Sequence, residues 1–126
     1  MPSSGSFTRP LILAVDNAVM FLSTLKRLLD GEPYELHCES SANDALKFLE
    51  SNRPDLILLD IEMPDMDGYD LARLIKRRGF SAPILFITAN SDKEYLDKAI
   101  EAGAAGLLMK PLRRTQLMEK IKEFAR

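Results

Sequence analysis

The feature that most constrains the fold of this chain is a run of apolar residues that does not alternate with polar ones. Residues 56–59 read Leu-Ile-Leu-Leu, and a turn signal with Pro64 and Gly68 follows. A run this short and unbroken predicts a strand buried on both faces, as in the interior of a parallel sheet. Asp60 stands at the carboxyl end of this strand. Because ligands bind at that edge in open parallel α/β sheets, Asp60 is the first candidate for chemistry.

Three further apolar runs predict buried strands of the same kind. They cover residues 11–15, 84–87 and 106–109. The polar residues that follow these runs are Asp16, Thr88 and Lys110. Because the carboxyl ends of parallel strands meet at one edge of the sheet, we expect these side chains to gather near Asp60.

Residues 34–38 follow a different pattern, because apolar and polar side chains alternate there. Tyr34, Leu36 and Cys38 would share one face of a strand. This alternation is typical of a half-exposed edge strand, and it predicts that His37 faces solvent.

Helical spacing of apolar residues fills the gaps between the predicted strands. The patterns lie within residues 22–29, 42–49, 71–75, 96–103 and 117–124. Ser41 and Asp44 predict the start of the second helix, and the capping-box spacing of Ser91 and Glu94 predicts that of the fourth. Strands that alternate with helices predict a parallel sheet covered on both faces. We therefore predict an α/β, flavodoxin-like, doubly wound five-stranded parallel sheet of order 2-1-3-4-5 with five helices.

Length and composition limit the class of protein. The chain has 126 residues, of which 46% are hydrophobic and 29% charged, as in an ordinary globular protein with one domain. Residues 1–8 are predicted to form a flexible N-terminal tail and residues 9–126 the folded domain. No apolar run approaches the roughly 20 residues of a spanning helix, and the N-terminus has no signal-peptide pattern. We therefore expect a cytoplasmic protein that does not contact a membrane.

Residue counts argue against several kinds of site. The single cysteine, Cys38, excludes an internal disulfide, and one histidine is too few for a Cys/His zinc constellation. The net charge of −2 at pH 7 gives no general electrostatic reason to bind nucleic acid directly. Disulfide-stabilised, zinc-binding and nucleic-acid-binding classes are therefore not expected.

Asp16, Asp60, Thr88 and Lys110 suggest a particular chemistry. The two aspartates would flank the crevice between the first and third strands, where a surplus of carboxylates is costly unless a cation occupies it. Mg²⁺ prefers oxygen ligands from a few carboxylates, with water and phosphate completing its shell. A lysine and a hydroxyl opposite would hold phosphoryl oxygens. Because a carboxylate can itself be the nucleophile, these residues suit the formation of an aspartyl phosphate.

Six short motifs occur in order along the chain. They are Val15-Asp16, Leu59-Asp60, Met63-Pro64, Asp67-Gly68, Thr88-Ala89 and Lys110-Pro111. Each dipeptide is weak evidence, but all of them at these spacings are highly specific. With these motifs the chain resembles the receiver domains of two-component response regulators, of which the chemotaxis regulator is the single-domain example. The resemblance covers about residues 9–126.

The resemblance implies a signalling module that is not an enzyme beyond catalysing its own phosphorylation and dephosphorylation. Asp60 would take a phosphoryl group from a histidine kinase, a phosphotransfer protein or a small phosphodonor, and Thr88 and Lys110 would sense it. Asp16, Asp60 and the backbone carbonyl of Glu62 would bind Mg²⁺. The output would be a changed face of the fourth helix, last strand and fifth helix, read by an unidentified downstream protein. The Lys110–Pro111 peptide bond is expected to be cis, so that the lysine turns back toward Asp60.

Two positions depart from the usual pattern of this family. Asn17 stands where most receivers carry a second acidic residue, so it is expected to be a weak ligand and Mg²⁺ to bind less tightly. The side chain of Glu62 is a candidate to restore the missing charge, the alternative being a solvated loop residue. Leu107 stands where many members carry an aromatic switch residue. We therefore expect phosphorylation to be read out mainly by a backbone shift around residues 89–91.

Three alternative functions compete with this prediction. A receiver-fold interaction module that no longer needs phosphate is supported by Asn17 alone and opposed by the retained phosphate-handling residues. A flavodoxin-type FMN protein would need a Ser/Thr/Gly-rich phosphate cradle, which residues 16–21 (DNAVMF) lack. An aspartate-nucleophile phosphatase would carry a D-x-D signature where this chain has Asp16-Asn17-Ala18.

Overall fold

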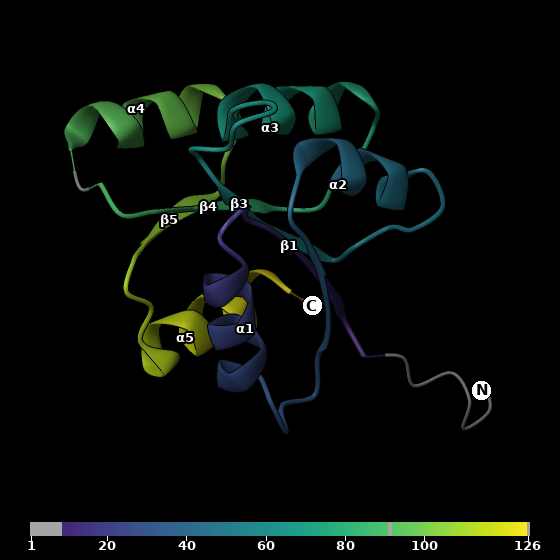
Figure 1. The fold of residues 1–126 in the computed structure, drawn as a ribbon, viewed down its shortest axis with the longest axis vertical. Coiled ribbons are helices and arrows are strands. Elements are labelled where there is room, and N and C mark those ends of the chain that lie inside the picture. Colours follow the sequence, from purple (N-terminus) through teal and green to yellow (C-terminus); the bar gives the residue numbers. More distant parts are fainter. Residues whose placement is uncertain (1–8, 91, 126) are drawn as a thin grey trace.

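A computed structural model describes residues 9–90 and 92–125, which form a parallel sheet of five strands in the order β2-β1-β3-β4-β5 (Figure 1). The strands are β1 (Leu11–Val15), β2 (Glu35–Glu39), β3 (Leu56–Asp60), β4 (Ile84–Thr88) and β5 (Gly106–Met109). The helices are α1 (Val19–Leu28), α2 (Ala42–Leu49), α3 (Gly68–Arg77), α4 (Lys93–Glu101) and α5 (Arg114–Phe124). The predicted fold class and strand order are confirmed. The predicted tail at residues 1–8 and the predicted cap at Ser91 lie outside the described residues.

Helices cover both faces of the sheet, with α2, α3 and α4 on one face and α1 and α5 on the other (Figure 1). A buried apolar cluster lies on each side. Successive residues of a strand point to opposite faces, so Ile57 and Leu59 enter one cluster while Leu56 and Leu58 enter the other. This double burial is the physical reason that the run at residues 56–59 has no polar position.

The parallel register brings the strand ends to one edge of the sheet. Val15 of β1 lies opposite Leu59 of β3, so Asp16 and Asp60 each come one position after this pair. Thr88 ends β4, which is paired in parallel with both β3 and β5. The polar side chains that follow the apolar runs therefore share the carboxyl edge.

His37 faces solvent only in part, since 39% of its side chain is exposed. Its ring stacks on Phe48 of α2 with 3.9 Å between ring centroids, and its Nε2 lies 2.5 Å from Oε2 of Glu39. The side chain is half-buried because α2 packs over the face of β2 that carries it. The alternating pattern correctly indicated an edge strand, but it could not indicate which helix would cover the polar positions.

The N-terminus of α2 is held by two side chains. Ser41 caps it as predicted, since its hydroxyl oxygen accepts a hydrogen bond from the Asp44 amide at 3.1 Å. The carboxylate of Asp65, in the loop after β3, accepts from the amides of Ala42 (3.3 Å) and Asn43 (3.1 Å). Slight burial raises the pKa of Asp65, but these amide donors outweigh it and lower the pKa overall. The β3–α3 loop is thereby tied to α2.

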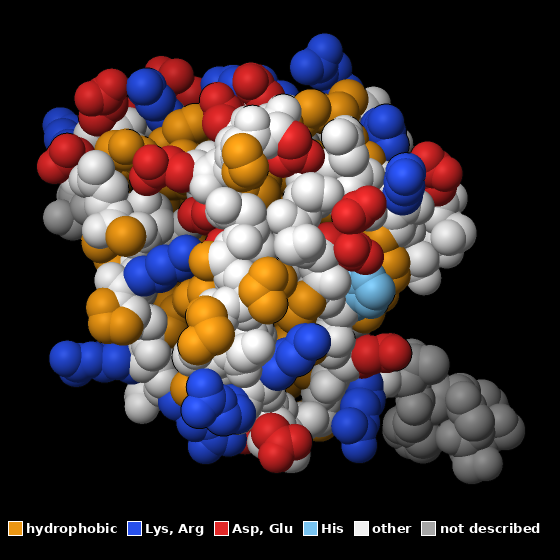
Figure 2. Space-filling view, viewed as in Figure 1, with side chains coloured by type: hydrophobic (Ala, Val, Ile, Leu, Met, Phe, Trp, Pro, Cys, Tyr) orange, Lys and Arg blue, Asp and Glu red, His pale blue; other side chains and the backbone are white. Residues whose placement is uncertain are grey.

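Figure 2 shows how side chains are distributed over one face of the molecule. Acidic and basic side chains mix over α3 and α4, while hydrophobic side chains gather over α1. Two of the large exposed hydrophobic residues, Val19 and Met20, begin α1 and are 64% and 81% exposed. No helix in the described part of the chain is long and apolar enough to cross a membrane.

Candidate functional site

The four predicted site residues come together at the carboxyl edge of the sheet. Asp16, Asp60 and Thr88 are buried, with only 2%, 8% and 1% of their surfaces exposed, and they are the buried polar residues of the described chain. Lys110 follows β5 and reaches into the same crevice. Its Nζ lies 2.8 Å from Oδ2 of Asp16 and 3.9 Å from Oδ1 of Asp60. The sequence prediction that these side chains converge is correct.

Asp16 has a fixed orientation because both of its carboxylate oxygens are engaged. Oδ1 accepts a hydrogen bond from the Ala18 amide at 2.8 Å, and Oδ2 accepts one from Lys110 at 2.8 Å. Taking such charges out of water is costly, and good geometry with further hydrogen bonds offsets that cost. The carboxylate of Asp16 thus anchors the ammonium of Lys110 across the crevice.

The negative charge of Asp60 is less well compensated than that of Asp16. Burial, and next to it the charge of Asp16, raise the pKa of Asp60 from 3.8 to about 6, against the lowering effects of Lys110 and of the Glu62 amide. The carboxylate of Asp60 therefore has few positively charged neighbours, and it lies at the carboxyl end of the buried strand β3. Such a group is a suitable nucleophile for phosphorus and a suitable ligand for a cation.

Thr88 and the start of the following loop complete the wall of the crevice. The hydroxyl oxygen of Thr88 accepts a hydrogen bond from the Asn90 amide at 3.0 Å, which leaves the hydroxyl hydrogen free to be donated elsewhere. The Thr88 carbonyl accepts from the Lys110 amide at 2.8 Å. The Lys110–Pro111 bond is cis, so that prediction is confirmed.

Gly68 is required by a close approach to the phosphoacceptor candidate. A Cβ built at this position would lie 2.3 Å from the backbone oxygen of Asp60 and 2.9 Å from Cα of Ile61. The Gly68 amide donates to the Ile61 carbonyl at 2.7 Å, which closes the loop directly after β3. The Asp67-Gly68 motif is thus a steric requirement, and Asp67 also caps α3 by accepting from the Asp70 amide at 2.9 Å.

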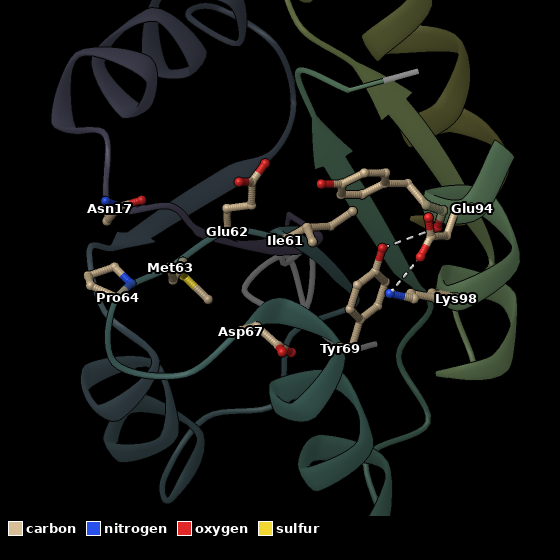
Figure 3. A pocket seen from close by; sticks show the side chains of 10 residues that line it. Asn17, Ile61, Glu62, Met63, Pro64, Asp67, Tyr69, Glu94 and Lys98 are labelled. Atoms are coloured by element: carbon tan, nitrogen blue, oxygen red, sulfur yellow. Dashed lines mark hydrogen bonds and ion pairs between the residues drawn. The ribbon is translucent and has the colours of Figure 1, made fainter. Parts of the chain in front are cut away.

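A pocket of about 590 Å³ opens beside the buried carboxylates. Figure 3 shows Asn17 and Glu62 toward one end and Glu94 and Lys98 at the other, with Tyr69 near that second end. Both Asn17 and Glu62 are exposed. The two residues predicted to decide the strength of metal binding therefore line one hollow next to the crevice.

The donor set at the crevice fits Mg²⁺. Within residues 9–90 and 92–125, no group of three or more His, Cys, Asp or Glu side chains has the arrangement of a metal site. Mg²⁺ does not need such a cage, since it keeps several waters and is usually held by one or two carboxylates plus phosphate oxygens. Asp16 and Asp60 supply the carboxylates, and the burial of both beside one lysine leaves negative charge for a cation to neutralise.

Several residues that shape the site were not found from the sequence. Tyr69 of α3 donates its hydroxyl hydrogen to the Tyr95 carbonyl of α4 at 3.3 Å (Figure 3). Phe21 of α1 lies beneath the Lys110 ammonium. The only available indication for Phe21 was its helical spacing with Leu25, which indicates an inward face but no partner.

Fold and site together define a class of protein: a doubly wound parallel α/β domain with two carboxylates, a lysine and a threonine at the switch-point edge. The response regulator receiver domain family matches residues 12–122. The chain therefore belongs to the family of response regulator receiver domains, which are signalling modules of two-component systems and generally bind Mg²⁺ at an acidic pocket.

Individual relatives agree with this assignment. The two-component response regulator ARR10 of Arabidopsis thaliana is 35% identical over 108 residues, or 84% of this chain and 19% of that protein. The chain thus spans about a fifth of that relative. Similar solved structures include the signal receiver domain of an HD domain-containing protein from Pseudomonas fluorescens Pf-5, with a TM-score of 0.86, 32% identity, and 92% and 94% of the two chains covered. A CheY-like receiver domain protein from Methanospirillum hungatei JF-1 has a TM-score of 0.84 and 32% identity over 90% and 91% of the chains.

The uncompensated charge of Asp60 predicts a pH-dependent gain in stability on its removal. Because its pKa is raised when folded, ionisation of Asp60 costs stability above about pH 6, and the cost disappears as the pH falls toward 3.8. In EDTA at pH 7.5, Asp60→Asn should raise the free energy of unfolding by roughly 1–2 kcal/mol, a value discounted for partial solvent screening. Urea titrations at several pH values measure it.

The matched control is Asp97→Asn on the exposed side of α4, which should change stability by less than about 0.5 kcal/mol. A gain for Asp60→Asn that is as large at pH 4 as at pH 7.5 would contradict the electrostatic explanation.

Proposed function

We propose that this chain is a phosphoacceptor module that takes a phosphoryl group onto Asp60 and passes the signal to another protein. The observation that carries the proposal is the buried Asp60 carboxylate with Lys110 Nζ 3.9 Å away and Thr88 ending the neighbouring strand. A nucleophile, an ammonium and a hydroxyl at one strand edge are what phosphoryl transfer requires of a protein.

The proposed transfer forms one bond and breaks another. An oxygen of Asp60 attacks phosphorus while the bond from phosphorus to the donor's histidine nitrogen breaks, and the donor leaves with that electron pair. With acetyl phosphate, the bond that breaks joins phosphorus to the acetate oxygen. Lys110 and Thr88 hold the phosphoryl oxygens, each by donating hydrogen bonds.

Mg²⁺, when bound, supplies neutralisation of the negative charge that develops on the phosphoryl oxygens. The residues proposed to hold it are Asp16, Asp60 and the backbone carbonyl of Glu62, with Asn17 as a weak contributor. The amide oxygen of Asn17 carries a dipole where an acidic residue would carry a full charge. We infer that Glu62 restores part of that charge, because its side chain lines the same pocket as Asn17.

The proposed phosphodonor is a histidine kinase or a phosphotransfer protein that docks beside the crevice. Val19 and Met20 are exposed large hydrophobic residues at the start of α1, directly after the loop that Asp16 orients. Exposed apolar side chains next to a reactive group suit a protein partner. We propose that the protein acts in the cytoplasm, through proteins and without direct binding to nucleic acid or membrane.

The proposed output is a change in the face made by α4, β5 and α5. Leu96 and Ile100 of α4 are 42% and 61% exposed, so α4 presents apolar surface to a downstream partner. Leu107 of β5 is partly buried against the apolar cluster of α2, α3 and α4. Since its side chain has no hydroxyl, we infer that readout is mainly a backbone shift of the loop after Thr88 and of this face.

The first test of the proposal is phosphorylation of Asp60 itself. Incubation with acetyl phosphate and Mg²⁺ should add one phosphoryl group, detected by intact-protein mass spectrometry, and Asp60→Asn should abolish the addition. Asp97→Asn is the control for loss of an exposed aspartate that is not one of the crevice residues. A mass increase that persists in Asp60→Asn would contradict the assignment, and no increase in the wild-type protein would favour a phosphorylation-independent interaction module.

The second test maps the readout. Beryllofluoride with Mg²⁺ should shift amide resonances around residues 89–91 and across α4, β5 and α5, because Thr88 moves toward the bound group and draws its loop with it. Spectra of ¹⁵N-labelled protein with and without beryllofluoride measure the shifts. Shifts confined to α1 and β1 would contradict a response at the proposed face.

The third test concerns charge compensation at the metal site. Glu62→Gln should weaken Mg²⁺ binding and slow phosphorylation, whereas Asn17→Asp should tighten binding and make Glu62 dispensable. Mg²⁺ titrations of the two single variants and the double variant complete a thermodynamic cycle. Effects that are strictly additive would show that Glu62 does not stand in for an acidic residue at position 17.

A further inference from the structure

Lys110 has a third partner besides the two aspartates. Its Nζ lies 4.3 Å from the centroid of the Phe21 ring. A cation over an aromatic face is attracted by the ring quadrupole within about 6 Å. Phe21 sits in the first turn of α1 and is half-buried, so the α1 helix supplies a wall for a side chain that comes from the opposite end of the chain.

Holding the Lys110 side chain in one position has an entropic cost that favourable contacts must offset. Its four-carbon stem loses considerable rotamer freedom when it is held in one geometry. The Lys110 side chain is still 21% exposed, whereas that of Asp16 is 3% exposed. The ion pair with Asp16 fixes the ammonium from one side, and the Phe21 ring shields it from water on another. Exclusion of water strengthens the attraction of the ammonium for an anion in the crevice.

The ring also has an advantage over a third carboxylate as a partner of the Lys110 ammonium. A π-face attracts the ammonium without accepting a directed hydrogen bond of normal strength. The N–H groups of Lys110 that do not bind Asp16 therefore stay available for phosphoryl oxygens. An added carboxylate would bind them and would increase the surplus of negative charge around Asp60.

We propose that Phe21 is a positioning residue that holds the Lys110 ammonium in the crevice by a cation–π interaction. The competing explanation is that Phe21 only packs, since it also touches the apolar cluster beneath α1 and α5. A leucine would pack there too, but it has no quadrupole. The expected effect of Phe21 on phosphorylation rests on the proposed function. Its expected effect on the position of the Lys110 ammonium does not.

The position of the ammonium is tested by NMR of the full chain labelled with ¹⁵N and ¹³C in lysine. The ring current of Phe21 should shift the Lys110 ε-methylene and ammonium protons upfield. This shift should be lost in Phe21→Leu, and the ammonium should become more mobile in ¹⁵N relaxation. The Lys98 resonances serve as an internal reference, because its Nζ pairs with Glu94 on α4, away from Phe21.

The electronic origin is tested with fluorinated phenylalanines at position 21. Fluorine withdraws electron density from the ring face while nearly preserving its shape, so packing is retained as the cation–π attraction weakens. Each added fluorine should make the Lys110 ammonium more mobile and should slow phosphorylation by acetyl phosphate. Phe21→Leu should be about three- to tenfold slower than wild type. Phe21→Trp, with a stronger quadrupole, should retain the rate.

The matched control is Phe124→Leu, which removes a ring that lies 5.9 Å from Lys120 on α5. It should leave both the Lys110 resonances and the rate unchanged. The proposal is overturned if the Lys110 resonances and mobility are the same in wild type and Phe21→Leu, or if the fluorinated series shows no graded change. If wild-type protein takes no phosphoryl group, the proposed function fails, and the NMR comparison still decides whether Phe21 positions Lys110.

Discussion

The ion pair between Lys110 and Asp16 joins two residues that are 94 positions apart in the chain, with 2.8 Å between their charged atoms. It forms only when β1 and β5 lie in the same parallel sheet, with β3 and β4 between them. Removing Lys110 would leave the buried carboxylate of Asp16 without its counter-ion, which is more costly than losing an exposed pair. The geometry of the crevice therefore depends on the correct stacking of all the buried strands.

The negative charge at the crevice is only partly neutralised by positive charge. One lysine faces two buried carboxylates, and the closer of the two holds it. Asp60 is left with a raised pKa, for which burial is the main cause and Asp16 the next. The same deficit that makes the ionised site unfavourable in isolation would favour the divalent cation and the phosphoryl group of the proposed function. Stability and function are thus opposed at this edge of the sheet.

The loop after β3 is held to its surroundings at several points. Gly68 closes it against the backbone of Asp60, and Asp65 joins it to the N-terminus of α2. Beyond the loop, Tyr69 reaches the first turn of α4. Because these contacts are direct, the backbone around Asp60 is mechanically connected to two helices on one face of the sheet. The hydrogen bond from Tyr69 thus joins the helix that follows this loop directly to α4.

Local sequence patterns determined the strands, their order and the polar residues at their ends. An unbroken apolar run such as residues 56–59 is stable only when it is buried on both faces of a sheet. Its burial places Asp60 at the sheet edge where Asp16, Thr88 and Lys110 also lie. The partners of those side chains were decided by tertiary structure alone. The helical spacing within residues 22–29 did not indicate that Phe21 would meet Lys110, and the alternation in β2 did not predict that α2 would cover His37. Such contacts join residues far apart in the chain, and they depend on how helices rotate and pack over the sheet, which periodicity within one element does not encode.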